Sequence, residues 1–218
     1  MGRVPLAVKI AVPIVGLLLG LLVLFVTAAV FKAWWSLPFG MFTVKADQPI
    51  EFPHDVHADQ LGIDCLFCHR GANIDEAASV PSVQQCMVCH QVVDEGHSAA
   101  GTVDIAKLRE AAANEQPINW VRVHRLPDHV QFTHEAHIKF FSEQNNIAPS
   151  QVCSTCHGDV KSMGVDVQVR NLKMRDCVDC HRDGYLSYLT DQSRTAVLEA
   201  VRSGHMAPPP TDCFQCHY

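Results

Sequence analysis

The chain has 218 residues, with 17 basic and 23 acidic side chains and a formal net charge of −6. A net acidic chain without a run of Lys or Arg does not suit nucleic acid, because phosphate contacts need clustered cations. Charged residues make up 18% of the chain, below the roughly 25% of typical soluble proteins, which indicates an apolar segment. Ten cysteines and thirteen histidines point to metal binding.

Residues 10–31 form an uncharged segment. As a helix with a rise of about 1.5 Å per residue, it would cross a hydrocarbon core of about 30 Å. Arg3 and Lys9 precede the segment, and Lys32 and two tryptophans follow it. We therefore predict a cytoplasmic N-terminus over residues 1–9, a single transmembrane helix over residues 10–32 and a linker over residues 33–45. The remainder is expected on the periplasmic side of the inner membrane.

Two other interpretations of this segment are open. A cleaved signal peptide could use the small-residue site at Val26-Thr27-Ala28, but its apolar region usually spans only about 7–15 residues. A buried helix of a soluble domain would need a partner large enough to cover it, and no other segment of the chain is large enough to do so. The length of the segment favours a retained anchor.

All ten cysteines belong to five C-x-x-C-H strings, which is the attachment signal of c-type haem. The thiols bond to the two haem vinyl groups, and the adjacent histidine is the proximal iron ligand. We predict five covalently bound haem c groups. The attachment residues are Cys65, Cys68, Cys86, Cys89, Cys153, Cys156, Cys177, Cys180, Cys213 and Cys216, and the proximal histidines are His69, His90, His157, His181 and His217.

Three competing interpretations explain less of this pattern. Zinc knuckles use C-x-x-C pairs but do not require a histidine after each pair. A thioredoxin-like redox site uses one such pair, beside a βαβ pattern that the sequence lacks. A disulfide scaffold would not impose a uniform two-residue gap.

A second motif, F-x-H-x-x-H, occurs at residues 52–57 and 132–137, and each copy precedes two haem motifs. This indicates two-haem repeats over residues 50–92 and 130–183, with a fifth haem over residues 205–218. Histidines three apart share a helix face and could reach two neighbouring irons, although a solvated helix face would give the same spacing. We predict these histidines as distal ligands: His54, His57, His134 and His137.

The fifth distal ligand is selected from the single histidines. His124 is the first choice, because it lies in a segment of alternating apolar residues that leads into a predicted turn. His205 is the second choice. His97 lies in a polar loop and is expected to be exposed, and His129 is expected at the surface or in a hydrogen bond. Methionine ligation would raise a haem potential, but packing is the simpler role for Met163, Met174 and Met206.

With two histidines on every iron, neither oxygen nor nitrite nor peroxide could bind. We therefore expect no catalytic site in this chain, only electron transfer. Five haems on 179 residues (40–218) must lie close together and form much of the core.

The predicted fold is mainly irregular with short α-helices and no sheet of consequence, in one pentahaem cytochrome domain over residues 46–218. Helices are expected over residues 102–114, with Thr102 as N-cap, and over residues 190–203, ending at Gly204. Each C-x-x-C-H string is expected to close a short helical turn.

Through the F-x-H-x-x-H motif before paired haem motifs, the sequence resembles the class III (cytochrome c3-like) multihaem family. Residues 46–218 resemble more closely the pentahaem membrane subunits of alternative complex III. The matching strings lie at residues 81–86, 120–128, 132–137, 153–158 and 212–218. The chain departs from that pattern in two places. Between His137 and Cys153 it has ten residues more than the shorter loop that the resemblance leads us to expect, and at position 129 it has a histidine where we expect an aromatic residue.

This resemblance implies an N-terminal anchor, five bis-histidine haems and no catalytic site. It implies the distal ligands His54, His57, His124, His134 and His137. It also implies partners, namely an iron–sulfur subunit, integral quinol-oxidising subunits and a monohaem cytochrome c.

Three functions follow as hypotheses. The first is a respiratory electron relay, which takes electrons from menaquinol oxidation in partner subunits to a periplasmic acceptor. The second is a self-sufficient quinol dehydrogenase with a quinol pocket near residues 34–42 and His54, a segment without an obvious proton acceptor. The third, a substrate-reducing haem enzyme, conflicts with the ligand count.

Overall fold

The computed structural model describes residues 5–36 and 46–218. The chain divides into two compact units, one containing helix α1 and the other containing residues 46–218. Most of the predicted linker over residues 33–45 lies outside the described residues.

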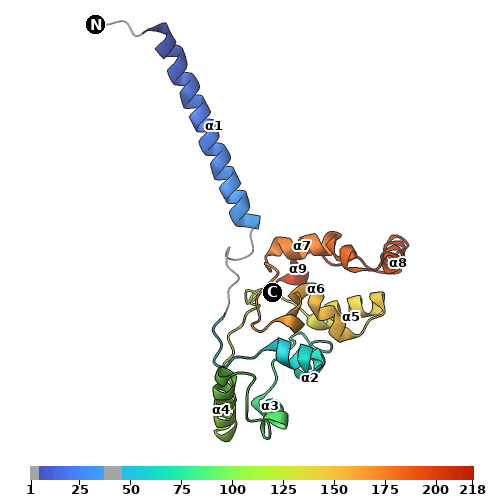
Figure 1. Ribbon diagram of the computed structural model, residues 1–218. Coiled ribbons are helices and arrows are strands. Elements are labelled where there is room, and N and C mark those ends of the chain that lie inside the picture. Colours follow the sequence, from blue (N-terminus) through green and yellow to red (C-terminus); the bar gives the residue numbers. More distant parts are fainter. Residues whose placement is uncertain (1–4, 37–45) are drawn as a thin grey trace. The chain divides into compact units, whose positions relative to one another are not determined.

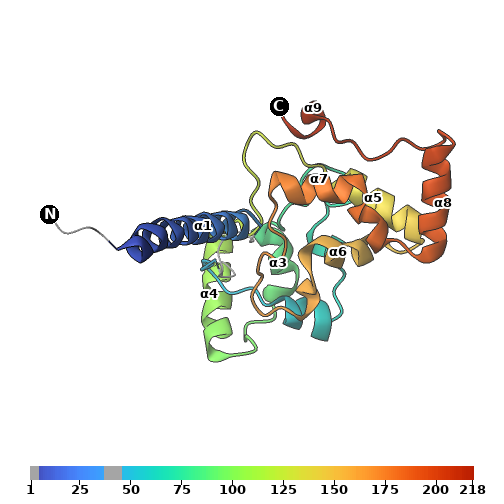
Figure 2. The same ribbon diagram turned by 90° about the horizontal axis from the view of Figure 1, so that it is seen from above.

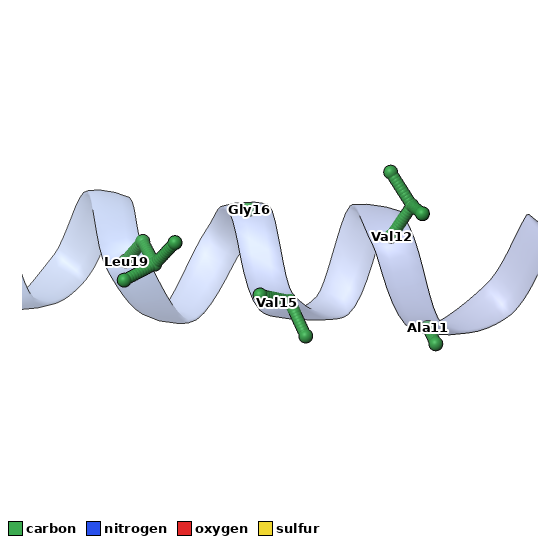
Figure 3. A pocket seen from close by; sticks show the side chains of 5 residues that line it. All are labelled: Ala11, Val12, Val15, Gly16 and Leu19. Carbon is green, nitrogen blue, oxygen red and sulfur yellow. The ribbon is translucent and has the colours of Figure 1, made fainter. Parts of the chain in front are cut away.

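Helix α1 (Leu6–Ser36) is the long apolar helix at the start of the chain (Figure 1). Its portion Ala7–Ala33 is long and apolar enough to cross a membrane, judged by length and composition. Its apolar side chains are exposed, as a lipid-facing helix requires. Figure 3 shows a shallow apolar hollow on this helix, where Gly16 adds no side chain; its lining is Ala11, Val12, Val15, Gly16 and Leu19.

The second unit is built from short helices joined by irregular segments. Within residues 46–218 no strand is present, and an isolated antiparallel bridge joins Val130 to His217. The predicted fold class is confirmed. The elements are η1 (Asp55–Gln60), α2 (Cys65–Cys68), α3 (Val83–His90), α4 (Ala99–Ala113), α5 (His134–Asn145), η2 (Pro149–Val152), α6 (Cys153–His157), η3 (Val160–Ser162), α7 (Met174–Arg182), η4 (Gly184–Tyr188), α8 (Asp191–Arg202) and α9 (Cys213–Cys216).

Each pair of motif cysteines lies in one helix, namely α2, α3, α6, α7 or α9. Polar residues fix where two of these helices begin. The Asp64 side chain accepts a hydrogen bond from the backbone N–H of Leu66, and the Ser82 side chain accepts one from Gln85. Such caps satisfy backbone donors that the first helical turn leaves free. The expected helical turns at the haem motifs are therefore present.

The two longer predicted helices differ in how well their starts were predicted. Helix α8 begins within one residue of the expected start, with Thr190 as its N-cap, and is followed by Gly204 with φ +75°, where the helix was expected to end. Helix α4 begins three residues earlier than expected, so the prediction of Thr102 as its N-cap is wrong. Ser98 is the cap, because its hydroxyl accepts from Gly101 N–H at 3.1 Å. The Thr102 hydroxyl instead donates to the carbonyl of Ser98.

The additional residues before Cys153 form ordered structure instead of a loop. They extend helix α5 to Asn145, after which Asn146 takes a left-handed conformation with φ 52° and η2 follows. The Asn145 amide donates to the carbonyl of Tyr188 at 2.9 Å and accepts from Thr190 N–H at 3.1 Å. These bonds tie α5 to the start of α8, which packs against it (Figure 2).

The apolar core is small and consists of two clusters. The larger joins α5, η2, η4 and α8, and its members are Ala72, Ile138, Phe141, Val152, Tyr185, Leu189 and Val197. The smaller cluster joins Ile50 to Val83 of α3 and Leu108 of α4.

Candidate metal centres

The ten motif cysteines are free thiols. Burial raises the pKa of the Cys153 thiol to about 12, and a hydrogen bond and charge interaction with Cys65 add to this shift. Burial also raises the pKa of Cys68, Cys86, Cys156, Cys177 and Cys180. Covalent attachment of a cofactor requires two thiols in each motif that are not joined to each other in a disulfide.

Four of the five proximal histidines are held through Nδ1 by a backbone carbonyl. The pairs are His69 with Ser79 at 2.7 Å, His90 with Val93 at 3.2 Å, His181 with Pro210 at 2.6 Å and His217 with His129 at 3.3 Å. Because a carbonyl oxygen only accepts, Nδ1 carries the hydrogen in each case. The lone pair on Nε2 is then free for a metal, which is the usual arrangement of a ligating histidine.

The first F-x-H-x-x-H motif has a defined geometry. The ring of Phe52 stacks on His57, with centroids 4.3 Å apart and planes within 21°, and meets His54 edge-on at 5.1 Å. His57 Nδ1 lies 2.9 Å from the carbonyl oxygen of Pro53. Both contacts orient the His57 ring and leave its Nε2 free.

The second motif repeats this geometry on the first turn of α5. Phe132 stacks on His137 at 4.5 Å and 25° and meets His134 edge-on at 4.9 Å. His137 Nδ1 lies 2.8 Å from the carbonyl oxygen of Thr133, and His134 Nδ1 lies 2.7 Å from that of Glu76. The internal repeat in the sequence is therefore also a repeat in structure.

Three distal candidates face proximal histidines across a suitable gap. The ring centroids are 6.1 Å apart for His57 and His90, 6.4 Å for His134 and His157, and 5.8 Å for His137 and His181. Metal–nitrogen bonds to histidine are about 2 Å long, and the ring centroid lies about 1 Å behind the nitrogen. Two imidazoles on one iron therefore have centroids roughly 6 Å apart.

His54 is the fourth candidate. Burial lowers its pKa, and interaction with the neighbouring His69 lowers it further, against the opposing effect of Asp166. Its Nδ1 is buried without a hydrogen-bond partner, as is Oδ1 of Asp166. The first repeat thus places a neutral histidine beside the proximal histidine of the first motif.

The single histidines lie at different places. His205 is exposed and its Nδ1 contacts the hydroxyl of Ser203 at 2.8 Å. His97 is exposed, as predicted. His124 contacts His157. His129, which the sequence analysis did not select, stacks near His217 with centroids 5.4 Å apart. The structure therefore brings His129 to the last motif and does not bring His124 there.

Burial favours the uncharged form of three histidines at these motifs. It lowers the pKa of His157 to about 4, and interactions with His124 and His134 add to the shift. It also lowers the pKa of His137 and His124. Only neutral imidazole has a lone pair for a metal. These side chains are therefore in the ligating form at neutral pH.

Cysteines of neighbouring motifs lie close enough to raise one another's pKa. The pKa of Cys68 is raised by Cys86 and Cys89, that of Cys153 by Cys65, that of Cys156 by Cys180 and that of Cys177 by Cys216. Hydrogen bonds support three of these junctions. The Gln85 side chain donates to the carbonyl of Phe67, the Cys65 thiol to that of Ser150, and His181 to that of Pro210.

The residues at the motifs therefore fit covalently attached haem c, with two free thiols and an oriented histidine in each. The side chains of residues 34–42, where a quinol pocket was expected, are not among those that the structure describes. His54, the other residue expected at that pocket, belongs to the first repeat.

Two comparisons with known proteins support this conclusion. Residues 35–116 match the class III cytochrome c family. The chain is 26% identical, over 205 residues, to the menaquinone reductase multihaem cytochrome c subunit of Nitratidesulfovibrio vulgaris strain Hildenborough; the match covers 88% of this chain and 86% of that protein. Both matches are to multihaem cytochromes of the c type, so they support the class III character and the covalently bound haem expected from the motifs.

Proposed function

We propose that this chain is a membrane-anchored pentahaem cytochrome c that relays electrons between quinol chemistry in partner subunits and a periplasmic acceptor. The observation that carries the proposal is the set of facing histidines, since each C-x-x-C-H histidine has a second histidine near it. Haem c, when bound, supplies one-electron transfer through its iron. The protein's own residues orient the ligands and close the irons to other molecules.

The proposed ligand pairs are His69 with His54, His90 with His57, His157 with His134, and His181 with His137. Three of these pairs rest on centroid distances of 5.8–6.4 Å. The pair of His54 and His69 rests on the burial of His54 and its interaction with His69. An iron with histidine on both sides has no position for a substrate, which disfavours a catalytic role.

The hydrogen bonds that join neighbouring motifs, together with the effects of their cysteines on one another's pKa, support an order of haems along the unit. Numbered by their motifs, the haems would follow one another as second, first, third, fourth and fifth. Figure 1 agrees with the two ends of this order, because α3 lies at one end of the cytochrome unit, α2 and α6 lie in its middle, and α7 and α9 lie together towards the other end. An electron relay requires that each haem lies close to the next one, in a single unbranched series.

The location and partners are part of the proposal. Helix α1 would anchor the chain in the inner membrane, with the N-terminus inside and the haem unit in the periplasm. We propose an iron–sulfur subunit, integral quinone-reactive subunits and a monohaem cytochrome c as partners, in an assembly of the alternative complex III type. The name of the menaquinone reductase subunit supports an assembly that acts on menaquinone.

That name also favours a second candidate, in which the same relay runs in the opposite direction and delivers electrons to menaquinone. The ligand geometry is identical for both directions, since a closed iron accepts and donates a single electron. The potentials of the donor and the acceptor decide between them.

The test is anaerobic reduction by a menaquinol analogue, followed at the haem α-band, on the purified chain and on the detergent-extracted native assembly. We expect only the assembly to be reduced. Rapid reduction of the isolated chain would establish a quinol site in this chain, which is the self-sufficient dehydrogenase. If the assembly fails to oxidise menaquinol but its reduced haems are oxidised by menaquinone, the second direction is correct.

A further inference from the structure

The segment between the two repeats contains two histidines, His124 and His129, which contact different haem motifs. His124 Nε2 lies 3.3 Å from His157 Nδ1, with ring centroids 4.4 Å apart and planes at 77°. The His129 ring lies 5.4 Å from that of His217, with the planes within 19°. These two positions imply two different roles.

His124 approaches His157 at Nδ1, the nitrogen opposite the one that would bind a metal. His134 stands 6.4 Å from His157 with nearly parallel planes, at a separation that suits an iron between them. The nitrogen of His157 that contacts His124 is Nδ1, so Nε2 remains for the metal. A centroid distance of 4.4 Å also leaves no room for an iron between His124 and His157.

His129 is held beside the last motif by its backbone. Its carbonyl oxygen accepts from His217 Nδ1 and from Tyr218 N–H, both at 3.3 Å. The next residue, Val130, forms an antiparallel bridge with His217, and Gln131 N–H donates to the carbonyl of Cys216 at 2.8 Å. Three hydrogen bonds at this segment, two of which make up the bridge, fix where the His129 side chain begins.

We propose that His129 is the distal ligand of the haem attached to Cys213 and Cys216, and that His124 is a positioning residue for His157. This inference rests on the proposed function, because it requires a haem at each motif. It differs from the family resemblance, which implies His124 as the fifth distal ligand.

The role of His124 follows from the hydrogen bond. With His157 ligating through Nε2, its Nδ1–H donates to His124 Nε2, and His124 Nδ1 then faces the Asp166 carboxylate at 3.7 Å. A hydrogen-bond acceptor behind a ligating histidine fixes the ring and makes it a stronger base. Stronger donation to iron favours the ferric state, so His124 lowers the potential of the third haem.

The experiment compares four variants of the purified haem-loaded chain with the wild type. Haem content is measured by the pyridine haemochrome assay, ligation by magnetic circular dichroism, and midpoint potentials by redox titration. In His129→Ala we expect about one fifth of the haem to become high-spin, since one of five motifs loses a ligand, and added imidazole to reverse the change. His129→Met retains a ligand and is expected to show one His/Met haem with a raised potential.

For His124→Ala we expect all haems to remain low-spin, with the potential of one haem raised. His124→Gln keeps an acceptor and is expected to restore that potential. High-spin haem in His124→Ala with none in His129→Ala would overturn the proposal, and so would unchanged spectra in both His129 variants. A wild-type chain with fewer than five haems would instead contradict the proposed function, so the two failures are distinguishable.

Discussion

Phe132 stacks on His137 at a centroid distance of 4.5 Å, and the equivalent pair in the first repeat, Phe52 and His57, stacks at 4.3 Å. In both repeats a carbonyl four residues before the histidine also holds its Nδ1. The aromatic residue of the F-x-H-x-x-H motif thus fixes the plane of the second histidine. Under the proposed ligation both of these histidines would be axial ligands, and the plane of an axial imidazole affects the electronic state of the iron, which gives the phenylalanine a role that can be measured.

Replacing this phenylalanine tests that function. In Phe132→Leu, we expect the electron paramagnetic resonance signal of one low-spin haem to shift and the free energy of unfolding to fall by about 1 kcal/mol, as for other aromatic contacts. The haem content should stay at the wild-type value. Phe25→Leu is the control, because Phe25 lies in α1 and is 71% exposed. Identical spectra for the two variants would show that stacking does not orient His137.

The segment before the fourth motif is held by a clamp around Arg170. Its guanidinium donates to both carboxylate oxygens of Asp176, at 3.1 and 2.9 Å, and to the hydroxyl of Tyr188 at 2.9 Å. The hydrogen bond to Asp176 holds the pKa of Arg170 above its ordinary value. Lysine cannot make this planar, two-pronged contact, so Arg170→Lys should cost about 1–3 kcal/mol in denaturant unfolding.

Arg175→Lys is the matched control for the clamp. Arg175 and its partner Asp179 are 62% and 58% exposed, and exposed pairs of this kind contribute little to stability. We expect the control to unfold at nearly the wild-type denaturant concentration. Equal losses in the two variants would mean that the buried geometry of the clamp does not matter.

The carboxylate of Asp104 makes stability depend on pH at the start of the first repeat. Burial raises its pKa, but hydrogen bonds from Lys107 at 2.6 Å and from Glu51 N–H at 2.9 Å, with the Lys107 charge, leave it below the usual 3.8. The folded pKa is therefore lower than the unfolded one. The resulting stabilisation is complete above the unfolded pKa and is lost as pH falls through the folded pKa.

Asp104→Asn should remove that part of the pH dependence. Unfolding followed by circular dichroism is expected to show a smaller decrease in stability below about pH 5 in the variant than in the wild type. At neutral pH the variant should be less stable, because two charge-assisted hydrogen bonds are weakened. Parallel stability curves for the two proteins over the acid range would contradict the role of Asp104.

The proposed order of haems is checked by locating the five irons. Anomalous scattering from crystals of the haem-loaded chain gives their positions, and the sequence of each motif identifies them. We expect the first haem to lie between the second and the third, because the Gln85 side chain donates to the carbonyl of Phe67 while the Cys65 thiol donates to that of Ser150. A first haem that neighbours the fifth would rule this order out.

The sequence predicted what depends on local spacing. Each C-x-x-C-H string was expected to close a helical turn, and each pair of motif cysteines lies in one helix; α8 also lies where it was expected. Ser98 was overlooked because two good caps lie four residues apart, and a hydroxyl at either could begin α4. The neighbour of His217 could not be predicted from spacing, since 88 residues separate it from His129 and the contact depends on the bridge through Val130.

The central claim is that every iron in this chain is closed by two histidines and only passes electrons. Near-infrared magnetic circular dichroism of the oxidised, haem-loaded wild-type chain tests it most directly, because it separates bis-histidine, His/Met and high-spin haem. The account predicts a purely low-spin, bis-histidine spectrum. A high-spin component amounting to one haem or more per chain would contradict it and would give the chain an open iron for substrate.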